Sequence, residues 1–466
     1  MLLAEAEVSF LNLLSLFGLF AMIGFAWLMS SFRDRVNWRL VIVGIGLQLV
    51  LGAVFFNSQS WTFGGRFENG ILFYGFDAFF GLIKDWADAG GQFVFGAYAD
   101  APNDEKFSSV NPLFLLKTFG FGVLPTVIFF ASLMSVLYHI GIMEPIVKGI
   151  ARFMQKFLGT SGSESLAAAA NVFVGHTEAP LVVRPYIAGM TRSELNAMMV
   201  GGFATITGGL MAIFVNIGVS AGHLVTASII SAPAALVIAK ILQPETEESQ
   251  TMGTVSVTFE KQSSNVIEAA ATGASDGMKL AINIAAMLIA FLALIAMLDT
   301  ILLGIGELVQ LLWNLGKAEG DETAIDLNWS MKGLFGYLFW PFAWLMGIEQ
   351  KDCMTSGQLL GTKMVVNEFV SYIDFSSIIA DMSEKGEAAK VALSDRTQVI
   401  LTYALCGFSN FGAIGIQIGG IGPLAPNRKS DLAQLGLRAM LGGMLACCMT
   451  ACVAGMLYGV SGWLFG

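Results

Sequence analysis

The sequence predicts an all-α polytopic membrane protein, with about eight transmembrane helices and two re-entrant hairpins arranged as an inverted repeat. Three observations support this class. Of the 466 residues, 55% are hydrophobic and 13% are charged, and this charge content is about half the roughly 25% of an average soluble domain. Apolar runs long enough to cross a bilayer recur along the chain. Two further apolar segments are interrupted by acidic residues that lipid would not accept.

The predicted spans are apolar runs selected by the ~20-residue length of a membrane-crossing helix. They are Val8–Met29, Leu40–Phe56, Leu113–Ile140, Ala197–Val219, Leu224–Leu242, Leu280–Leu312, Val399–Ile421 and Leu435–Phe465. The second run is short, and the third contains Lys117. Segments Leu166–Ile187 and Leu359–Ile379 are apolar but contain polar residues, so they do not fit ordinary spans.

Basic residues in the short loops predict the orientation, because lysine and arginine concentrate on the cytoplasmic side. Arg33, Arg35 and Arg39 follow the first span, so this loop is expected inside. The connection 57–112 is acidic and is expected outside, and the basic segment 148–156 returns the chain to the inside. The same rule places both termini on the outer face, which is periplasmic in a bacterium.

The remaining composition excludes several classes of function. The net charge of −10 is spread over short loops, and no basic run typical of nucleic-acid binding is present. The five cysteines form neither CxxC pairs nor a His/Cys cluster, so we expect free thiols that pack as apolar groups, and no cofactor. Glu5 and Glu7 stand where a signal peptide has basic residues, so the first segment is expected to be retained.

Two polar interruptions break the rule that membrane segments are apolar. The first is Gly175–Glu178, which lies between an apolar segment and Pro180, and the second is the pair Asn367 and Glu368. A charged side chain at the bilayer centre costs at least ~2.5–3.5 kcal/mol on insertion scales, so an acid there indicates a functional site. Gly and Pro beside a polar cluster within an apolar segment are typical of a re-entrant hairpin.

Each predicted hairpin is followed by a span that is rich in glycine and hydroxyl side chains. These stretches are Gly201–Leu210 and Gly407–Gly420. Because each helical glycine costs up to ~1 kcal/mol relative to alanine, both spans are predicted to unwind near mid-membrane. A hairpin and a broken helix, occurring twice, are typical of an inverted-repeat secondary transporter. The alternative, in which the glycines only allow close helix packing, does not account for the intramembrane acids.

At these residues the sequence resembles the concentrative nucleoside transporter family, which couples nucleoside uptake to a cation gradient. The motifs that carry the resemblance are Gly361–Val370, of the pattern Gly-x-Lys-x-x-x-Asn-Glu-Phe-Val, and Thr177–Tyr186. The resemblance implies a homotrimer in a bacterial inner membrane, with interfacial helices and with scaffold and transport domains that work as an elevator.

The resemblance also implies a division of the chain into four parts. Residues 1–140 supply N-terminal scaffold helices, with an interfacial helix at about 70–96. Residues 141–265 form the first transport-domain repeat, with a hairpin at about 164–190, a broken helix at 197–219, a span at 224–242 and a loop at 243–265. Residues 266–330 supply a long scaffold helix and an external loop. Residues 331–466 form the second repeat, with a hairpin at 355–380, a broken helix at 396–421 and a last span at 435–465.

Two sets of site residues follow from the resemblance. Carboxylates are strong acceptors for hydroxyl donors, so glutamates suit a ribose better than an anionic substrate. The implied nucleoside-binding residues are His176, Thr177, Glu178, Leu210, Glu368, Phe408, Asn410 and Ala413. Sodium is implied at the side chains of Asn171 and Thr205 and at the backbone carbonyls of Val174 and Ile206, which are oxygen ligands that suit a hard cation. We expect Lys363 to stabilise its own hairpin.

Two positions depart from the family pattern. His176 stands where the family usually has Gln or Met, which leaves the choice between purine and pyrimidine bases open. Ala413 stands where the family often has Ser, so part of the ribose contact is missing or filled by water. Asn171 agrees with sodium coupling, because proton-coupled relatives have Ser at this position.

The expected function is therefore sodium-coupled symport that concentrates nucleosides in the cell by elevator-type alternating access. The alternatives are a proton-coupled nucleoside symporter, or a transporter of the same fold for a related nucleobase-containing solute. A passive channel would not need paired hairpins that enter from opposite sides. No catalytic arrangement is recognisable at membrane depth, so no enzyme is expected.

Overall fold

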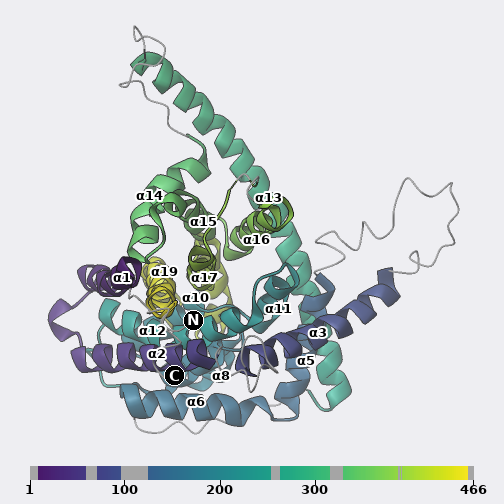
Figure 1. Ribbon diagram of the computed structural model, residues 1–466. Helices are drawn as coiled ribbons and strands as arrows, with labels where there is room; N and C mark the ends of the chain where they lie inside the picture. The colour runs from purple at the N-terminus through teal and green to yellow at the C-terminus, as the bar shows by residue number, and fades with distance from the viewer. Residues whose placement is uncertain are drawn as a thin grey trace, which may run out of the picture.

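The computed structural model describes residues 9–58, 71–95, 124–252, 263–314, 329–386, 389 and 391–459, and these residues are mostly helical, without a β-strand among them (Figure 1). Part of the predicted third span, with Lys117, and parts of the long loops lie outside the described residues.

The first five α-helices in the described part of the chain are α1 (Phe10–Leu28), α2 (Trp38–Ser58), α3 (Ile71–Phe95), α5 (Leu124–His139) and α6 (Met143–Leu158). The first four overlap segments that the sequence predicts as helical, whereas the fifth, α6, lies in a stretch for which no helix was predicted. Helix α3 coincides with the predicted interfacial segment. Helix α6 meets α5 at a bend of 80°, and its buried residues recur every third or fourth position from Met143 to Leu158, which is the pattern of an amphipathic helix.

The helices that follow occur in two series of the same order. The first series continues from α5 and α6 with α7 (Gly162–Asn171), α8 (Ala179–Val182), α9 (Arg184–Ile187), α10 (Arg192–Ala204), α11 (Gly208–Asn216) and α12 (Ala221–Leu242). The second comprises α13 (Val266–Trp313), α14 (Met331–Leu345), α15 (Cys353–Val365), α16 (Glu368–Lys385), α17 (Asp395–Leu405), α18 (Phe411–Ile421) and α19 (Lys429–Leu457). Each series runs through a long helix, a second helix, a hairpin, a broken helix and a final helix.

Among the described residues, six helical segments are long and apolar enough to cross a membrane, or seven if the bent pair α5–α6 counts as one span. The predicted span Val399–Ile421 does not pass this length test, because it is divided between α17 and α18. The predicted span Leu280–Leu312 is one part of the much longer α13, which has 48 residues and crosses the molecule diagonally (Figure 1). The chain is a polytopic helical membrane protein.

Helices α10, α12 and α19 pack against one another and form the centre of the molecule. Their apolar windows are each 89% buried. Helix α1 lies along α19, and α2 lies along α12, whereas α5 pairs with α13. Gly277 permits this last pairing, because a Cβ atom there would lie 2.7 Å from the Cα of Ile128. Both broken helices thus pack against this centre, α10 within it and α17 and α18 against α19, while α5 and α13 pair with each other.

Candidate substrate and cation site

The two helix breaks contact each other directly. Helix α10 ends at Ala204, α17 ends at Leu405, and the chain between each of them and the next helix is extended or irregular. The backbone N–H of Phe408 in the second break donates to the carbonyl oxygen of Thr205 in the first, at 3.3 Å. Gly407 makes this approach possible, since a Cβ atom there would lie 2.7 Å from the carbonyl oxygen of Phe203.

Each break is followed by a capped helix start. Thr207 Oγ1 accepts a hydrogen bond from the N–H of Leu210 at 3.1 Å, and Asn410 Oδ1 accepts one from the N–H of Ala413 at 2.8 Å. Such caps satisfy the donors that a helix N-terminus otherwise leaves unpaired. The hydroxyl and amide residues of the glycine-rich stretches therefore define where each half-helix begins again.

Hairpin 1 (residues 162–187, helices α7 to α9) places its tip, residues 172–178, against the first break. The N–H of Gly208 donates to the carbonyl of Phe173 at 3.2 Å. Gly175 packs against Thr207, where a Cβ atom would lie 2.6 Å from the threonine methyl group. The tip thus contacts the break through backbone groups and glycine, which leaves its polar side chains available for other contacts.

The predicted sodium residues gather where this tip meets α10. Asn171 is 1% exposed, and neither its Oδ1 nor its Nδ2 has a hydrogen-bond partner among the described residues. Its Nδ2 lies against Gly201, where a Cβ atom would be only 3.0 Å away. Thr205 Oγ1 donates to the carbonyl of Gly201 at 3.0 Å, so Asn171 and Thr205 flank the same turn of α10. Val174 and Ile206, in the tip and the break, are also buried.

The unpartnered amide of Asn171 fits the bound cation that the family resemblance implies there. A buried polar group without a hydrogen bond costs roughly 1–3 kcal/mol, and a cation that binds its oxygen would remove part of this cost. Amide, hydroxyl and carbonyl oxygens suit a hard cation such as sodium.

Hairpin 2 (residues 353–385, helices α15 and α16) carries the buried acid of the predicted nucleoside site. Asn367 Oδ1 accepts from the N–H of Val370 at 2.9 Å and so caps α16, which places Glu368 in its first turn. Glu368 is 3% exposed, and its Oε2 accepts a hydrogen bond from Asn410 Nδ2 at 3.0 Å. Asn410 therefore caps α18 with one side-chain atom and orients the carboxylate with the other. The side chain of Ala413 is buried next to this pair.

The remaining predicted nucleoside residues lie at the tip of hairpin 1. The ring of His176 meets the ring of Phe408 edge to face, with 4.5 Å between centroids, and neither ring nitrogen has a hydrogen-bond partner among the described residues. Thr177 is half-buried against Gly420 of α18. Leu210 is buried at the start of α11.

Glu178 is placed differently from Glu368. It is exposed, and its Oε2 accepts from the N–H of Gly175 at 3.4 Å. The structure therefore brings together His176 with Phe408 and Glu368 with Asn410, but no hydrogen bond joins Glu178 to either pair in the described part of the chain.

Two polar residues that the prediction did not place at the site hold its backbone. The ammonium group of Lys363 is completely buried and donates to the carbonyl of Ala404 at 2.7 Å, so Lys363 joins hairpin 2 to the last turn of α17. Tyr372 donates through its hydroxyl to the carbonyl of Thr402 at 2.6 Å in the same turn. A cation near a helix C-terminus is favourable, and both residues satisfy carbonyls that the broken helix leaves open.

Gln417 is a third residue that the prediction missed. It is completely buried, and its Nε2 donates to the carbonyl of Met199 in α10 at 3.1 Å. Gln417 and His176 both pack against Gly202. A Cβ atom at this glycine would lie 2.6 Å from Gln417 Nε2 and 2.6 Å from His176 Cβ. An isolated amide within an apolar helix is the sequence signal that identifies such a residue.

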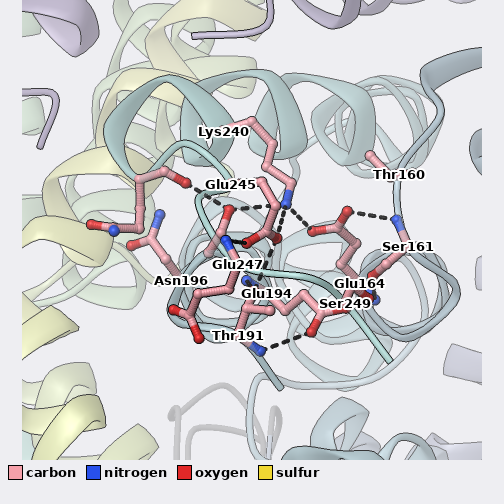
Figure 2. Close-up of polar contacts among 12 residues, drawn as sticks. Thr160, Ser161, Glu164, Thr191, Glu194, Asn196, Lys240, Glu245, Glu247 and Ser249 are labelled. Carbon is pink, nitrogen blue, oxygen red and sulfur yellow. Dashed lines mark hydrogen bonds and ion pairs between the residues drawn. The ribbon is translucent and has the colours of Figure 1, made fainter. Parts of the chain in front are cut away.

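The base of hairpin 1 is fixed by a buried polar cluster, shown in Figure 2. Lys240, in the last turn of α12, donates to Ser193 Oγ at 2.9 Å and pairs with Glu164 at 2.7 Å and with Glu245 at 3.3 Å. Glu164 belongs to the capping box at the start of α7. The cluster thus fastens the start of hairpin 1 to the end of α12.

Glu194 fastens the start of α10 in the same cluster. It forms a capping box with Thr191, and its Oε1 accepts hydrogen bonds from Ser163 at 3.1 Å, Ser249 at 2.5 Å and Thr251 at 3.0 Å. Both ends of hairpin 1 are therefore held at its base, and the tip is the part that lies at the predicted binding site.

Hairpin 2 is anchored at its base by different residues. Asp352 Oδ2 accepts from the N–H of Ser394 at 3.1 Å and from Thr397 Oγ1 at 2.7 Å, which joins α15 to α17. The guanidinium group of Arg396 donates to four acceptors on other elements. They are the carbonyl oxygens of Gly347 and Gly455 and the side chains of Asn12 and Ser15. Arg396 therefore also connects α17 with α1 and α19.

Three family models match the chain in succession. The N-terminus of Na+ dependent nucleoside transporters matches residues 17–98, a nucleoside recognition (Gate) model matches residues 120–221, and the C-terminus of Na+ dependent nucleoside transporters matches residues 223–455. The chain belongs to the concentrative nucleoside transporter family. This family consists of transporters, so the chain is a transporter and not an enzyme.

Similar proteins occur in bacteria and in animals. An uncharacterized transporter of Haemophilus influenzae is 40% identical over 451 residues, which cover 96% of this chain and 98% of that protein. The sodium/nucleoside cotransporter 1 of Rattus norvegicus is 38% identical over 436 residues, with 92% of this chain and 61% of that protein covered. Solute carrier family 28 member 3 of Homo sapiens is 38% identical over 96% of this chain and 60% of its own length. The chain spans about three fifths of the length of these animal relatives.

Solved structures of another concentrative nucleoside transporter share the whole fold. CNTnw in an inward-facing substrate-bound state is 38% identical and aligns with a TM-score of 0.81 over 97% of this chain and 99% of that one. A variant of CNTnw in an outward-facing state is 37% identical and aligns with a TM-score of 0.82. The family fold therefore occurs with access to either side of the membrane, as an alternating-access transporter requires.

Proposed function

We propose that the protein is a sodium-coupled symporter that concentrates nucleosides in the cell. The observation that carries this proposal is the contact between the two helix breaks. The N–H of Phe408, which lies beside His176, donates to the carbonyl of Thr205, which lies beside the unpartnered amide of Asn171. A cation at Asn171 and a nucleoside at Phe408 would thus share one piece of irregular backbone.

The chemistry of the second break suits the ribose. Glu368 is buried and oriented by Asn410, so its carboxylate would accept hydrogen bonds from ribose hydroxyls with little loss of side-chain entropy. Phe408 would pack against the nucleoside. A neutral substrate with several hydroxyl donors matches this arrangement better than an anion, which Glu368 would repel.

The tip of hairpin 1 would contact the base. His176 has two buried ring nitrogens without a partner among the described residues, and in its neutral form it has one donor and one acceptor for a base edge. We propose that Thr177 and Glu178 reach the base through water, because Glu178 is exposed. Leu210 would complete the apolar wall.

Sodium would act as a co-transported substrate whose binding orders the tip. Its proposed ligands are Asn171, Val174, Thr205 and Ile206, two from hairpin 1 and two from the first break. Binding of the ion would hold the tip against the break and so bring His176 into place for the nucleoside. The conformational cost is then shared by the two ligands, which makes their binding cooperative.

We propose that transport proceeds by an elevator movement of the hairpins and broken helices relative to α5 and α13. Residues 1–140 were expected in the scaffold, but α1 and α2 pack on α19 and α12, and Arg396 hydrogen-bonds to α1. We therefore propose, in place of that expectation, that these two N-terminal helices follow the moving part. The apolar window of α13 is only 6% buried, which supports a subunit interface in a homotrimer. We place the protein in a bacterial inner membrane with both termini on the periplasmic side.

Uptake into vesicles with imposed gradients tests the proposed function. Purified protein in proteoliposomes is given labelled uridine or adenosine under an inward sodium gradient, an inward proton gradient or no gradient. Accumulation above the outside concentration under the sodium gradient alone is expected. Accumulation under the proton gradient alone would support the proton-coupled alternative, and competition with all common nucleosides would determine the base preference that His176 leaves open.

A further inference from the structure

A cavity lies along hairpin 2, apart from the proposed nucleoside site. It has a volume of about 680 Å³, which is within the ~300–1,000 Å³ of small-molecule pockets. Its walls come from α14, α15, α16 and the segment that follows α16. None of the predicted nucleoside or sodium residues lines it. We refer to this cavity as the hairpin groove.

The groove has a polar face on each arm of the hairpin. Thr355, Gln358 and Thr362 line it from α15, and Asp374, Ser377 and Asp381 line it from α16. In each set the residues are three or four positions apart, so they share one side of their helix. Lipid against these faces would leave polar groups unsatisfied at membrane depth, which indicates that water or a polar ligand fills the groove.

The polar side chains that line the groove from α15 have no hydrogen-bond partner among the described residues. The side chains of Thr355, Gln358 and Thr362 make no hydrogen bond with any residue in the described part of the chain, although all three border the cavity. They offer two hydroxyl groups and one amide to a ligand. A glutamine amide has a donor and an acceptor side by side and matches the paired donor and acceptor on the edge of a nucleobase.

The charges of the described residues that line the groove cancel. Lys332 Nζ pairs with Asp374 Oδ2 at 2.6 Å and thereby joins α14 to α16, while Lys385 pairs with Asp381 one turn apart on α16. Among the described residues that line the groove, two cations thus balance two carboxylates, so this lining has hydrogen-bonding groups but no net charge. Such a site suits a neutral solute with several donors and acceptors better than a phosphate or a metal ion.

We propose that the hairpin groove is an outer recognition site for the nucleoside, which the substrate occupies before it reaches Glu368. This inference rests on the proposed function. The groove extends from Lys385 at the base of the hairpin to Thr362 in the last turn of α15, next to the tip that carries Asn367 and Glu368. The ribose hydroxyls donate to Asp374 and Asp381, and Gln358 meets the base.

Cysteine labelling tests whether the groove contains water. The native cysteines are all buried, so a single introduced thiol reports against a low background. Ser377→Cys is placed on the groove face of α16, where Ser377 is exposed. The matched control is Ser376→Cys, because Ser376 points to another face and donates to the carbonyl of Ile217. We expect a charged, membrane-impermeant methanethiosulfonate reagent to modify the first variant much faster than the second. Equal or absent modification of the two would overturn the proposal.

Protection by substrate tests binding in the groove itself. The labelling of Ser377→Cys is repeated in a Glu368→Gln background, which removes the ribose acceptor of the main site, with uridine, adenosine or inorganic phosphate added. A several-fold slower modification with a nucleoside and no change with phosphate is the expected result. Modification at the same rate with and without nucleosides, or protection by phosphate as strong as that by nucleosides, would contradict it. Thr355→Cys replaces Ser377→Cys if that variant does not reach the membrane.

Uptake measurements separate the groove from the proposed function. Gln358→Ala is expected to raise the KM for nucleoside several-fold and to leave the sodium concentration for half-maximal uptake unchanged. If wild-type protein accumulates nucleosides but Ser377→Cys is not protected, the groove proposal fails and the proposed function stands. If wild-type protein accumulates no nucleoside at all, the proposed function itself fails.

Discussion

The backbone N–H of Phe408 donates a hydrogen bond to the carbonyl oxygen of Thr205, at 3.3 Å. This bond joins the second helix break to the first, although the two residues belong to different repeats. Thr205 lies one turn from the glycine that contacts Asn171, and Phe408 contacts His176. We expect a shift at either end to change the backbone geometry at the other, which would couple the proposed ion site to the proposed nucleoside site.

Asn171→Ser is predicted to weaken the dependence of uptake on sodium. The shorter side chain would withdraw the amide oxygen from the proposed ion site and so remove one ligand from the cation. A loss of roughly 1.4 kcal/mol in binding free energy corresponds to a tenfold loss of affinity. We expect the sodium concentration for half-maximal uptake to rise about tenfold, measured as a sodium titration at fixed nucleoside. Asn196→Ser is the matched control, since this buried asparagine of α10 instead donates to the carbonyl of Ala239. A sodium titration unchanged in Asn171→Ser would contradict the ion site.

Glu368→Gln is predicted to abolish uptake while the protein stays folded. The amide would keep the shape of the side chain but lose the charge that accepts ribose hydroxyls, and it would turn an N–H group toward either the ribose or Asn410 Nδ2. Hydrogen bonds to charged groups are worth roughly 1.5–3 kcal/mol each, so loss of two would lower nucleoside affinity by more than a hundredfold, as measured by uptake and by binding of labelled nucleoside.

Glu384→Gln on the exposed end of the same helix serves as the control for this prediction. It removes a carboxylate from α16 without affecting Asn410 or either helix break. Uptake in this control should equal that of the wild type. Normal uptake in Glu368→Gln would remove the central acid from the proposed site.

Much of the architecture could be predicted from the sequence because the membrane imposes a strong penalty on polar groups. Glu368 is a charged residue within an apolar segment, and in the structure it lies at the tip of hairpin 2. The glycines around residue 407 are weak helix formers, and in the structure they follow the end of α17 at the helix break. Lys363 was harder to place. The sequence puts it on hairpin 2, but its partner is a carbonyl of α17 that is distant along the chain.

The part of the site that sequence patterns could not predict consists of such long-range contacts. Gln417 reaches Met199 on another repeat, and Phe408 reaches Thr205. These contacts depend on how the two repeats cross, and no local pattern of residues determines that crossing.

Lys363→Met is predicted to raise the KM for nucleoside more than it lowers the maximal rate. Loss of the ammonium group leaves the carbonyl of Ala404 without its buried donor, at a cost of roughly 1–3 kcal/mol, and releases the segment that carries Phe408 and Asn410. Lys363→Arg should restore part of the affinity, because arginine also donates to a carbonyl, and Lys351→Met at an exposed position should behave as the wild type. An equal loss in both lysine variants at 363, with the KM unchanged, would show that the residue acts only in folding.

Lys240→Met is predicted to reduce the stability of the protein more than its substrate affinity. The ammonium group of Lys240 pairs with Glu164 and Glu245 in the buried cluster of Figure 2, and removal of one partner from such a buried pair costs about 3–5 kcal/mol because the remaining charge is uncompensated. Hairpin 1 would then lose its anchor to α12, while Asn171 and His176 at its other end keep their local contacts. A lower midpoint of thermal unfolding in detergent is the expected result, with the KM for nucleoside in the surviving protein close to that of the wild type.

Lys279→Met tests the specificity of the effect, since the ion pair of Lys279 with Asp276 is exposed and such pairs contribute at most about 1 kcal/mol. If both variants unfold at the same temperature, the cluster does not anchor the hairpin.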